Sequence, residues 1–105
     1  MKEISVIELK KKMDNNEDFQ LIDVREDYEF ENANIGGEFI PMGTITSAIE
    51  RISKDKQVVI MCRSGRRSAS VIDLLEKSYG FSNLYNLKGG ILAYADEVDT
   101  TLDVE

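Results

Sequence analysis

The single cysteine of the chain begins a basic segment, Cys62–Ser68, whose sequence is Cys-Arg-Ser-Gly-Arg-Arg-Ser. The segment follows the apolar run 57–61 and precedes a stretch in which apolar residues recur at helical spacing up to Tyr79. A thiol just before a helix meets unpaired backbone N–H groups and the positive end of the helix dipole. Both favour the thiolate, which is the nucleophilic form of cysteine. The sequence therefore predicts that Cys62 is a reactive centre whose sulfur is ionised near neutral pH and accessible to solvent.

Three arginines follow the cysteine within five positions: Arg63, Arg66 and Arg67. Guanidinium groups favour a neighbouring thiolate and bind oxyanions through paired hydrogen bonds. We expect Arg63 and Arg66 to contact an anionic substrate from the middle of the loop. Arg67 lies where the helix should start, so it either contacts the substrate or pairs with an acidic neighbour.

We expect the other residues of the segment, a glycine and two serines, to shape the backbone and to form hydrogen bonds. Gly65 allows the chain to curl closely around the sulfur. Ser64 and Ser68 either donate hydrogen bonds to the sulfur or cap the helix. The alternative for Cys62 is a buried structural cysteine, which is common in small domains. A structural cysteine requires neither Gly65 nor adjacent charges that resist burial, so we favour the reactive interpretation.

Composition narrows the class of protein. A chain of 105 residues with 42% hydrophobic residues is expected to form one domain over 1–105. Apolar runs are too short to span a membrane, and the first residues do not resemble a secretory signal, so we expect a reducing cytoplasmic location. A net charge of −7 argues against nucleic-acid binding and, with the local arginine cluster, favours a small anionic ligand. The chain contains no histidine, which excludes Cys-His and Ser-His-Asp catalysis and zinc sites built from Cys and His.

Apolar runs alternate with helical patterns along the chain. Strands are expected at 2–4, 19–24, 38–41, 57–61 and 83–87, and helices at 6–13, 26–30, 44–52, up to Tyr79 and at 91–98. Ser5 and Glu8 have the spacing of a capping box, and Gly80 occupies the position of a helix C-terminal glycine. This order predicts an α/β domain with a mostly parallel sheet, whose ligand sits at the carboxyl ends of the strands. Cys62 directly follows the run expected to be the central strand.

Four motifs, in this order, resemble those of rhodanese-type sulfurtransferases, and together they cover most of the chain. They are Leu-Ile-Asp-Val-Arg-Glu at 21–26, Ile-Gly-Gly-Glu-Phe-Ile-Pro at 35–41, the cysteine loop at 62–68 and Asn-Leu-Lys-Gly-Gly-Ile-Leu-Ala-Tyr at 86–94. The resemblance implies a single rhodanese-like domain, with a central sheet of about five strands and helices on both faces. Asp23 and Arg25 belong to the first motif, and we expect them to be a paired structural support. The chain departs from many family members at Asn34, where they carry a histidine.

The resemblance also implies a reaction. The Cys62 thiolate attacks the outer sulfur of a donor such as thiosulfate, sulfite leaves, and the resulting persulfide passes its sulfur to cyanide or a thiol acceptor. Backbone N–H groups between Arg63 and Ser68 are expected to stabilise the sulfur anions. No metal or organic cofactor is expected, and a protein persulfide partner is compatible with this chemistry.

Two other functions remain open. Cysteine-dependent phosphatases carry a cysteine, five residues, an arginine and then Ser or Thr. Here Arg67 falls one residue early and Ser68 stands at the arginine position, which gives a smaller ring of amides. The other alternative is a persulfide carrier or protein-interaction module of the same fold, because a fold does not determine turnover.

Overall fold

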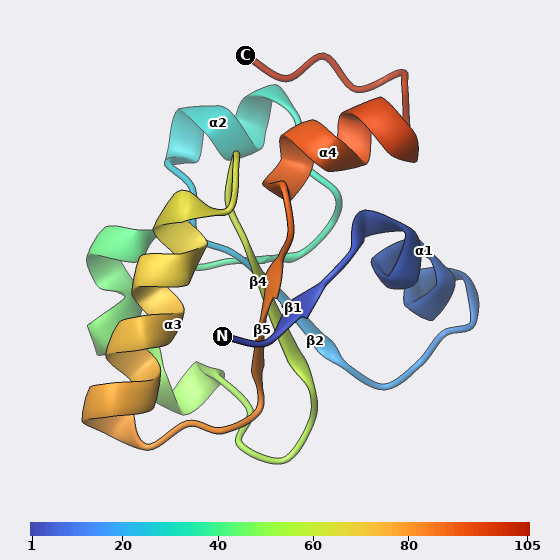
Figure 1. Ribbon diagram of the computed structural model, residues 1–105. Helices are drawn as coiled ribbons and strands as arrows, with labels where there is room; N and C mark the ends of the chain where they lie inside the picture. Colours follow the sequence, from blue (N-terminus) through green and yellow to red (C-terminus); the bar gives the residue numbers. More distant parts are fainter.

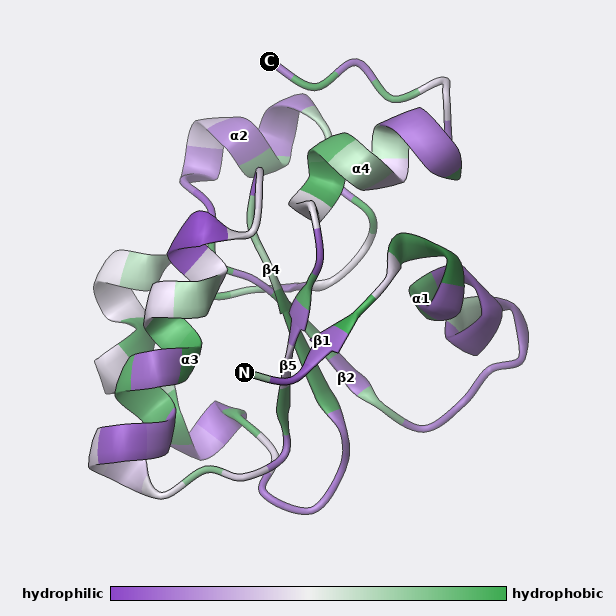
Figure 2. Cartoon of the chain, viewed as in Figure 1, coloured by the Kyte–Doolittle hydropathy of each residue, from purple (hydrophilic) through white to green (hydrophobic).

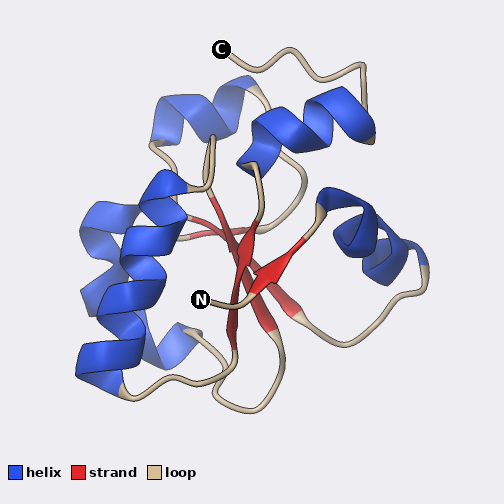
Figure 3. Ribbon diagram, in the orientation of Figure 1, coloured by secondary structure: helices blue, strands red, loops and turns tan.

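Five short strands form one sheet at the centre of the molecule, and each pairs with its neighbours in parallel (Figure 3). The computed structural model describes residues 1–105. The strand order is β1-β5-β4-β2-β3, so β4 is central and β1 and β3 are the edges, as predicted. The strands are β1 (Glu3–Ile4), β2 (Gln20–Asp23), β3 (Glu38–Phe39), β4 (Val58–Met61) and β5 (Leu84–Leu87).

Helical segments cover both faces of this sheet (Figure 1). They are α1 (Val6–Asp14), α2 (Asp27–Asn32), η1 (Met42–Arg51), α3 (Arg66–Tyr79) and α4 (Gly90–Glu97). The buried side chains of η1 and α3 share one core with one face of the sheet. Those of α1 and α4 share a second core with the other face. The prediction of an α/β domain with a parallel sheet between helices is therefore confirmed.

Strand β4 is apolar on both faces because each face packs under helices (Figure 2). Val58 and Ile60 face η1 and α3, whereas Val59 and Met61 face α1 and α4. All four side chains are fully buried. Each contributes about 1.5–3 kcal/mol relative to an exposed position, which makes this strand a rigid support for the residue that follows it.

The capping box of the first helix and the glycine at the C-terminus of α3 are both present, as the sequence predicted. The Ser5 side chain accepts a hydrogen bond from the Glu8 N–H, and Glu8 accepts one from the Ser5 N–H, each at 3.1 Å. Gly80 ends α3 with φ +72°, in the left-handed region that glycine adopts most readily. None of the helices is both long enough and apolar enough to cross a membrane.

The segment predicted as an amphipathic helix over 44–52 differs from the expectation. It is the 3₁₀ segment η1, interrupted at Ala48, whose φ of −121° and ψ of 21° are not helical. The buried residues Ile45 and Ala48 are three apart, which places them on one line of a 3₁₀ turn. The β-branched run Thr44–Thr46 also lowers the preference for an α-helix.

Candidate active site

Cys62 lies at the carboxyl end of the central strand, immediately after β4. The following turn is short because Gly65 adopts φ +100° and serves as the N-cap of α3. A Cβ at Gly65 would meet only ordinary contacts, the nearest at 3.5 Å, so the positive φ is the reason for glycine here. The structure thus places the cysteine, the curl and the helix start where the sequence predicted them.

Two backbone N–H donors and the Ser68 hydroxyl surround the Cys62 sulfur. The N–H of Gly65 donates to Sγ at 3.1 Å and that of Ser68 at 3.4 Å, and the Ser68 hydroxyl oxygen lies 3.3 Å from Sγ. Burial raises the pKa of the Cys62 thiol, but hydrogen bonds from Ser68, Gly65 and Ser64 outweigh this effect and hold that pKa below its ordinary value. The backbone N–H groups of Gly65 and Ser68 therefore favour the thiolate, the form that a cysteine nucleophile requires.

The sulfur is covered, and the expectation of an accessible sulfur is wrong for this structure. Cys62 has 0% of its surface exposed and belongs to the core on the α3 side of the sheet. The reason is that the side chain turns inward from the loop and packs in that core. A donor molecule can reach the sulfur only when atoms that cover it move. Burial agrees with the structural alternative for Cys62, whereas the converging donors agree with the reactive one.

The N-terminus of α4 holds the loop from the other side. The Ile91 N–H donates to the Cys62 carbonyl at 2.9 Å, and the Leu92 N–H donates to the Arg63 carbonyl at 3.1 Å. Gly90 allows this approach, because a Cβ there would lie far inside van der Waals contact of the Arg63 carbonyl oxygen. The sequence shows Gly90 only as part of the motif at 86–94, because the contact joins segments far apart in the chain.

The three arginines of the segment have different surroundings. Arg67 forms a two-pronged ion pair with Glu29 of α2, at 2.7 and 2.9 Å, which is the acidic partner considered from the sequence. The hydrogen bonds from Arg67 lower the pKa of Glu29 to about 2, and those to Glu29 raise the pKa of Arg67. Arg66 is the exposed first residue of α3 rather than a mid-loop residue. Arg63 is exposed and its Nε donates to the Glu105 carbonyl at 2.8 Å.

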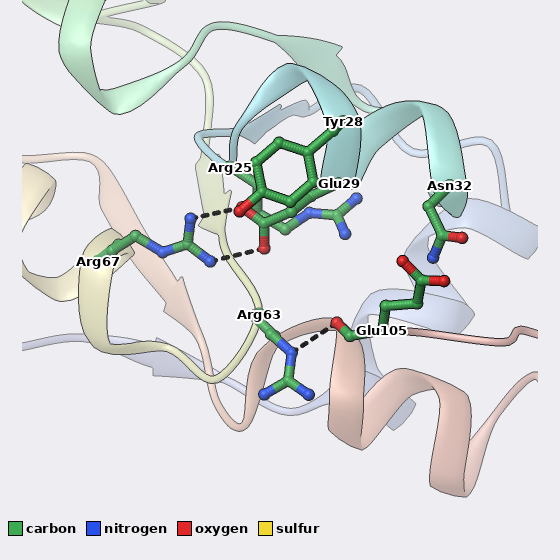
Figure 4. Close-up of a pocket in the computed structure, with 7 residues that line it drawn as sticks. All are labelled: Arg25, Tyr28, Glu29, Asn32, Arg63, Arg67 and Glu105. Carbon is green, nitrogen blue, oxygen red and sulfur yellow. Dashed lines mark hydrogen bonds and ion pairs between the residues drawn. The ribbon is translucent and has the colours of Figure 1, made fainter.

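A cavity of about 400 Å³ lies beside the loop (Figure 4). Arg63 and Arg67 contribute to its wall, but Cys62 and Arg66 do not. The C-terminal segment also borders this cavity, because Glu105 lines it. Asn32, another residue of the wall, donates to the Asp103 carbonyl at 3.0 Å and so holds that segment in place. Most of the lining is polar or charged, and the residues are Arg25, Tyr28, Glu29, Asn32, Arg63, Arg67 and Glu105. Of the three arginines in this wall, Arg67 pairs with Glu29 and Arg25 with Asp23, so Arg63 is the one without a carboxylate side-chain partner.

Asp23 and Arg25 form a buried ion pair, as predicted, with Nη2 and Oδ2 2.8 Å apart and both side chains 1% exposed. The Arg25 backbone N–H also donates to Asp23 at 3.1 Å, and its guanidinium donates to the Ala33 carbonyl at 2.7 Å. Because Arg25 bonds both Asp23 and the Ala33 carbonyl, it ties the end of β2 to the segment after α2. Removal of either charged partner would leave an unpaired buried charge.

In the segment after α2, Asn34 accepts a hydrogen bond from the Gly36 N–H at 3.0 Å and donates one to the Phe30 carbonyl at 3.1 Å, which stabilises the turn.

Ser68 does not cap α3, which was one of its two expected roles. It is the third residue of the helix, and its hydroxyl donates to Asn86 of β5 at 2.5 Å while facing Sγ. Ser64 is exposed. Sequence reasoning missed Asn86, whose signal was a polar residue on a buried face of an otherwise apolar strand.

Comparison with known proteins identifies the family. A family model described as "Rhodanese-like domain" matches residues 5–97. "Putative sulfurtransferase YtwF" of Bacillus subtilis is 42% identical over 98 residues, covering 92% of this chain and 93% of that protein. A protein of Allochromatium vinosum named "Sulfurtransferase" is 36% identical over 94 residues, covering 89% of this chain and 87% of that protein. These names support sulfur transfer as the general chemistry of relatives.

A solved structure agrees with this result. The rhodanese-like domain protein from Staphylococcus aureus has a TM-score of 0.83 at 34% identity, and the match covers 100% of this chain and 99% of that chain. The match therefore extends over the whole described fold. The chain belongs to the family of rhodanese-like domains.

Proposed function

We propose that this protein is a sulfurtransferase that carries a sulfane sulfur as a persulfide on Cys62. The observation that carries the proposal is the pair of backbone N–H groups, from Gly65 and Ser68, directed at Sγ at 3.1 and 3.4 Å. Donors fixed before the reaction stabilise negative charge without reorganisation, and they serve a thiolate and a persulfide alike. The donor we propose is thiosulfate or a related anionic persulfide.

The reaction has two halves. The Cys62 thiolate attacks the outer sulfur of thiosulfate, a new S–S bond forms, and the original S–S bond breaks as sulfite leaves with its electron pair. Cyanide or a thiol then attacks the outer sulfur of the persulfide, and the Cys62 thiolate is released. We propose that Arg63, which lines the cavity wall, binds the oxyanion portion of the donor.

A persulfide carrier is the second candidate, and the covered sulfur favours it. A sulfur with no exposed surface suits a protein that exchanges its persulfide with a partner protein able to displace the covering groups. The phosphatase alternative is weaker, because Arg67 is held by Glu29 and the Cys–Arg spacing is one residue short.

Intact mass spectrometry after incubation with thiosulfate tests the proposal. We expect one added sulfur, its removal by cyanide, and no addition in Cys62→Ser, whose fold should persist because the two side chains have similar shapes. A folded protein that gains no sulfur from thiosulfate or from a small-molecule persulfide would refute the chemistry. A stable persulfide without cyanide turnover would identify the carrier, and hydrolysis of p-nitrophenyl phosphate alone would identify a phosphatase.

A further inference from the structure

A buried polar chain extends from the Cys62 sulfur to β5, and the reaction described above does not use its last member. Sγ faces the Ser68 hydroxyl at 3.3 Å, and that hydroxyl bonds Asn86 Oδ1 at 2.5 Å. The Asn86 Nδ2 donates to the Gly65 carbonyl at 3.0 Å. Ser68 is 0% and Asn86 5% exposed, so both depend on protein partners for their hydrogen bonds.

The chemistry of these groups determines every donor in the chain. The Gly65 carbonyl can only accept, so Asn86 must present its NH₂ group there and its oxygen to Ser68. That oxygen can also only accept, so Ser68 must donate its single hydroxyl proton to Asn86. Toward the sulfur, Ser68 is then limited to accepting. This arrangement satisfies a protonated thiol, whose S–H donates to Ser68, but it leaves a thiolate without the hydroxyl donor.

We propose that Asn86 is a positioning residue that sets the ionisation of Cys62 through the Ser68 hydroxyl. When the thiol proton leaves to solvent, the hydroxyl of Ser68 rotates toward the sulfur and donates to the thiolate, and its own O–H bond stays intact. This rotation breaks the 2.5 Å hydrogen bond to Asn86. Asn86 and the thiolate therefore compete for one proton. This inference rests on the proposed function only in one respect: it takes the ionised sulfur of Cys62 as the nucleophile.

Charged and titratable groups also line the cavity beside the loop, and the test must separate their effect. They come from the loop, from α3, from α2 and the residues before it, and from the C-terminal segment: Arg63, Arg67, Glu29, Arg25, Tyr28 and Glu105. None of them forms a hydrogen bond with the side chains of Ser68 or Asn86. The residues of α4 that contact the loop, Gly90–Leu92, carry no charge. Substitutions at Ser68 and Asn86 leave all these groups in place.

A double-mutant cycle isolates the route through Ser68. The pKa of Cys62 is measured from the ultraviolet absorbance of the thiolate in the wild type, Asn86→Ala, Ser68→Ala and the double variant. The chain has one cysteine, so the signal has one source. Asn86→Ala frees the hydroxyl but also releases the Gly65 carbonyl, and only the second effect persists without Ser68. We expect the pKa shift caused by Asn86→Ala to be about 0.5–1 unit more negative in the wild-type background than in the Ser68→Ala background, which lacks the hydroxyl.

Equal shifts in the two backgrounds would overturn the proposal and make Asn86 a simple tether of the loop. Asn83→Ala is the matched control, because Asn83 precedes the same strand but donates to Ser53 and Lys56, at 2.8 and 2.6 Å. It should alter stability without moving the pKa of Cys62. If Asn86→Ala does not fold, Asn86→Leu keeps a similar shape and repeats the cycle. No sulfur donor is present in these titrations, so a failure of sulfur transfer and a failure of this inference are separate results.

Discussion

At the scale of single residues, the state of one sulfur depends on two opposing effects. Burial of Cys62 disfavours the thiolate, and the donors from Ser68 and Gly65 favour it. The donors dominate, so the pKa lies below the usual value although the side chain is covered. The loop therefore combines a thiol that ionises readily with restricted access, which is compatible with the proposed sulfur transfer from a particular donor or partner.

The first prediction concerns Arg63, which lines the cavity wall. Arg63→Ala should raise KM for thiosulfate about 5-fold with a smaller change in kcat, because a charge-assisted contact to the oxyanion is lost. Arg66→Ala is the comparison variant. The sequence suggested a substrate contact for Arg66 too, but the residue is exposed and outside the cavity lining, so its effect should be smaller. Unchanged KM in both variants would refute any assignment of these arginines to the donor.

At the scale of elements, two long-range contacts hold the cysteine loop. The Glu29–Arg67 ion pair joins α2 to the start of α3, and the N–H groups of α4 bind the carbonyls of Cys62 and Arg63. After Cys62 the side chains of the loop are charged or small, and Arg63 and Ser64 are exposed. The conformation of the loop therefore depends on contacts with α2, which precedes it in the sequence, and with α4, which follows it.

The ion pair predicts a dependence of stability on pH. The pKa of Glu29 falls from 4.5 to about 2 in the folded protein, so its stabilising contribution is complete above the unfolded value. It is lost as the pH falls through about 2, where the folded carboxylate becomes protonated. Glu29→Gln should lower the free energy of unfolding by about 1 kcal/mol at neutral pH, because the partly exposed pair is screened by solvent. Urea denaturation should show this difference shrinking in acid, and a difference that stays constant would contradict the role of the pair.

Gly90 provides the second prediction at this scale. A Cβ at Gly90 would clash with backbone atoms of Cys62 and Arg63, and side-chain rotation cannot relieve such a clash. Gly90→Ala should therefore cost about 2 kcal/mol or more in unfolding free energy and slow persulfide formation. Gly43→Ala is the control, because Gly43 has no heavy atom within 4 Å of the added Cβ. Similar denaturation curves for the two variants would show that the close approach is unimportant.

At the scale of the whole molecule, a parallel sheet with helices on both faces presents the loop at its carboxyl edge. The two cores lie on opposite faces, and β4 contributes alternate side chains to both. The chain carries a net charge of −7, whereas three arginines lie within residues 62–68 and one of them is paired with Glu29. This local group of arginines on an acidic protein supports the proposal of a small anionic ligand rather than a polyanion.

The central strand predicts how stability is distributed. Ile60→Ala should lower the free energy of unfolding by about 2–5 kcal/mol, because it removes a fully buried side chain and leaves a cavity. Ile7→Ala makes the same kind of truncation at a position that is 44% exposed on α1, and it should cost much less. Both values can be read from urea denaturation. Equal losses would mean that β4 is not the rigid support of the site.

The sequence by itself determined most of the elements and the place of Cys62 between the central strand and the following helix. The capping box at Ser5, the terminal Gly80 and the apolar run of β4 are local signals, since each depends on neighbours within a few positions. The 3₁₀ form of η1 was missed because the spacing of apolar residues does not distinguish a 3₁₀-helix from an α-helix. The two helices have similar numbers of residues per turn, so both bring residues three positions apart to nearly the same face.

Only the tertiary structure decided how the site is assembled. It paired Arg67 with Glu29 across 38 positions, placed Gly90 against the loop carbonyls and brought Asn86 to Ser68. It also covered the sulfur that the sequence led us to expect in contact with solvent. The physical reason is that hydrogen bonds, ion pairs and burial depend on which distant segments meet, and residue spacing along the chain does not contain that information.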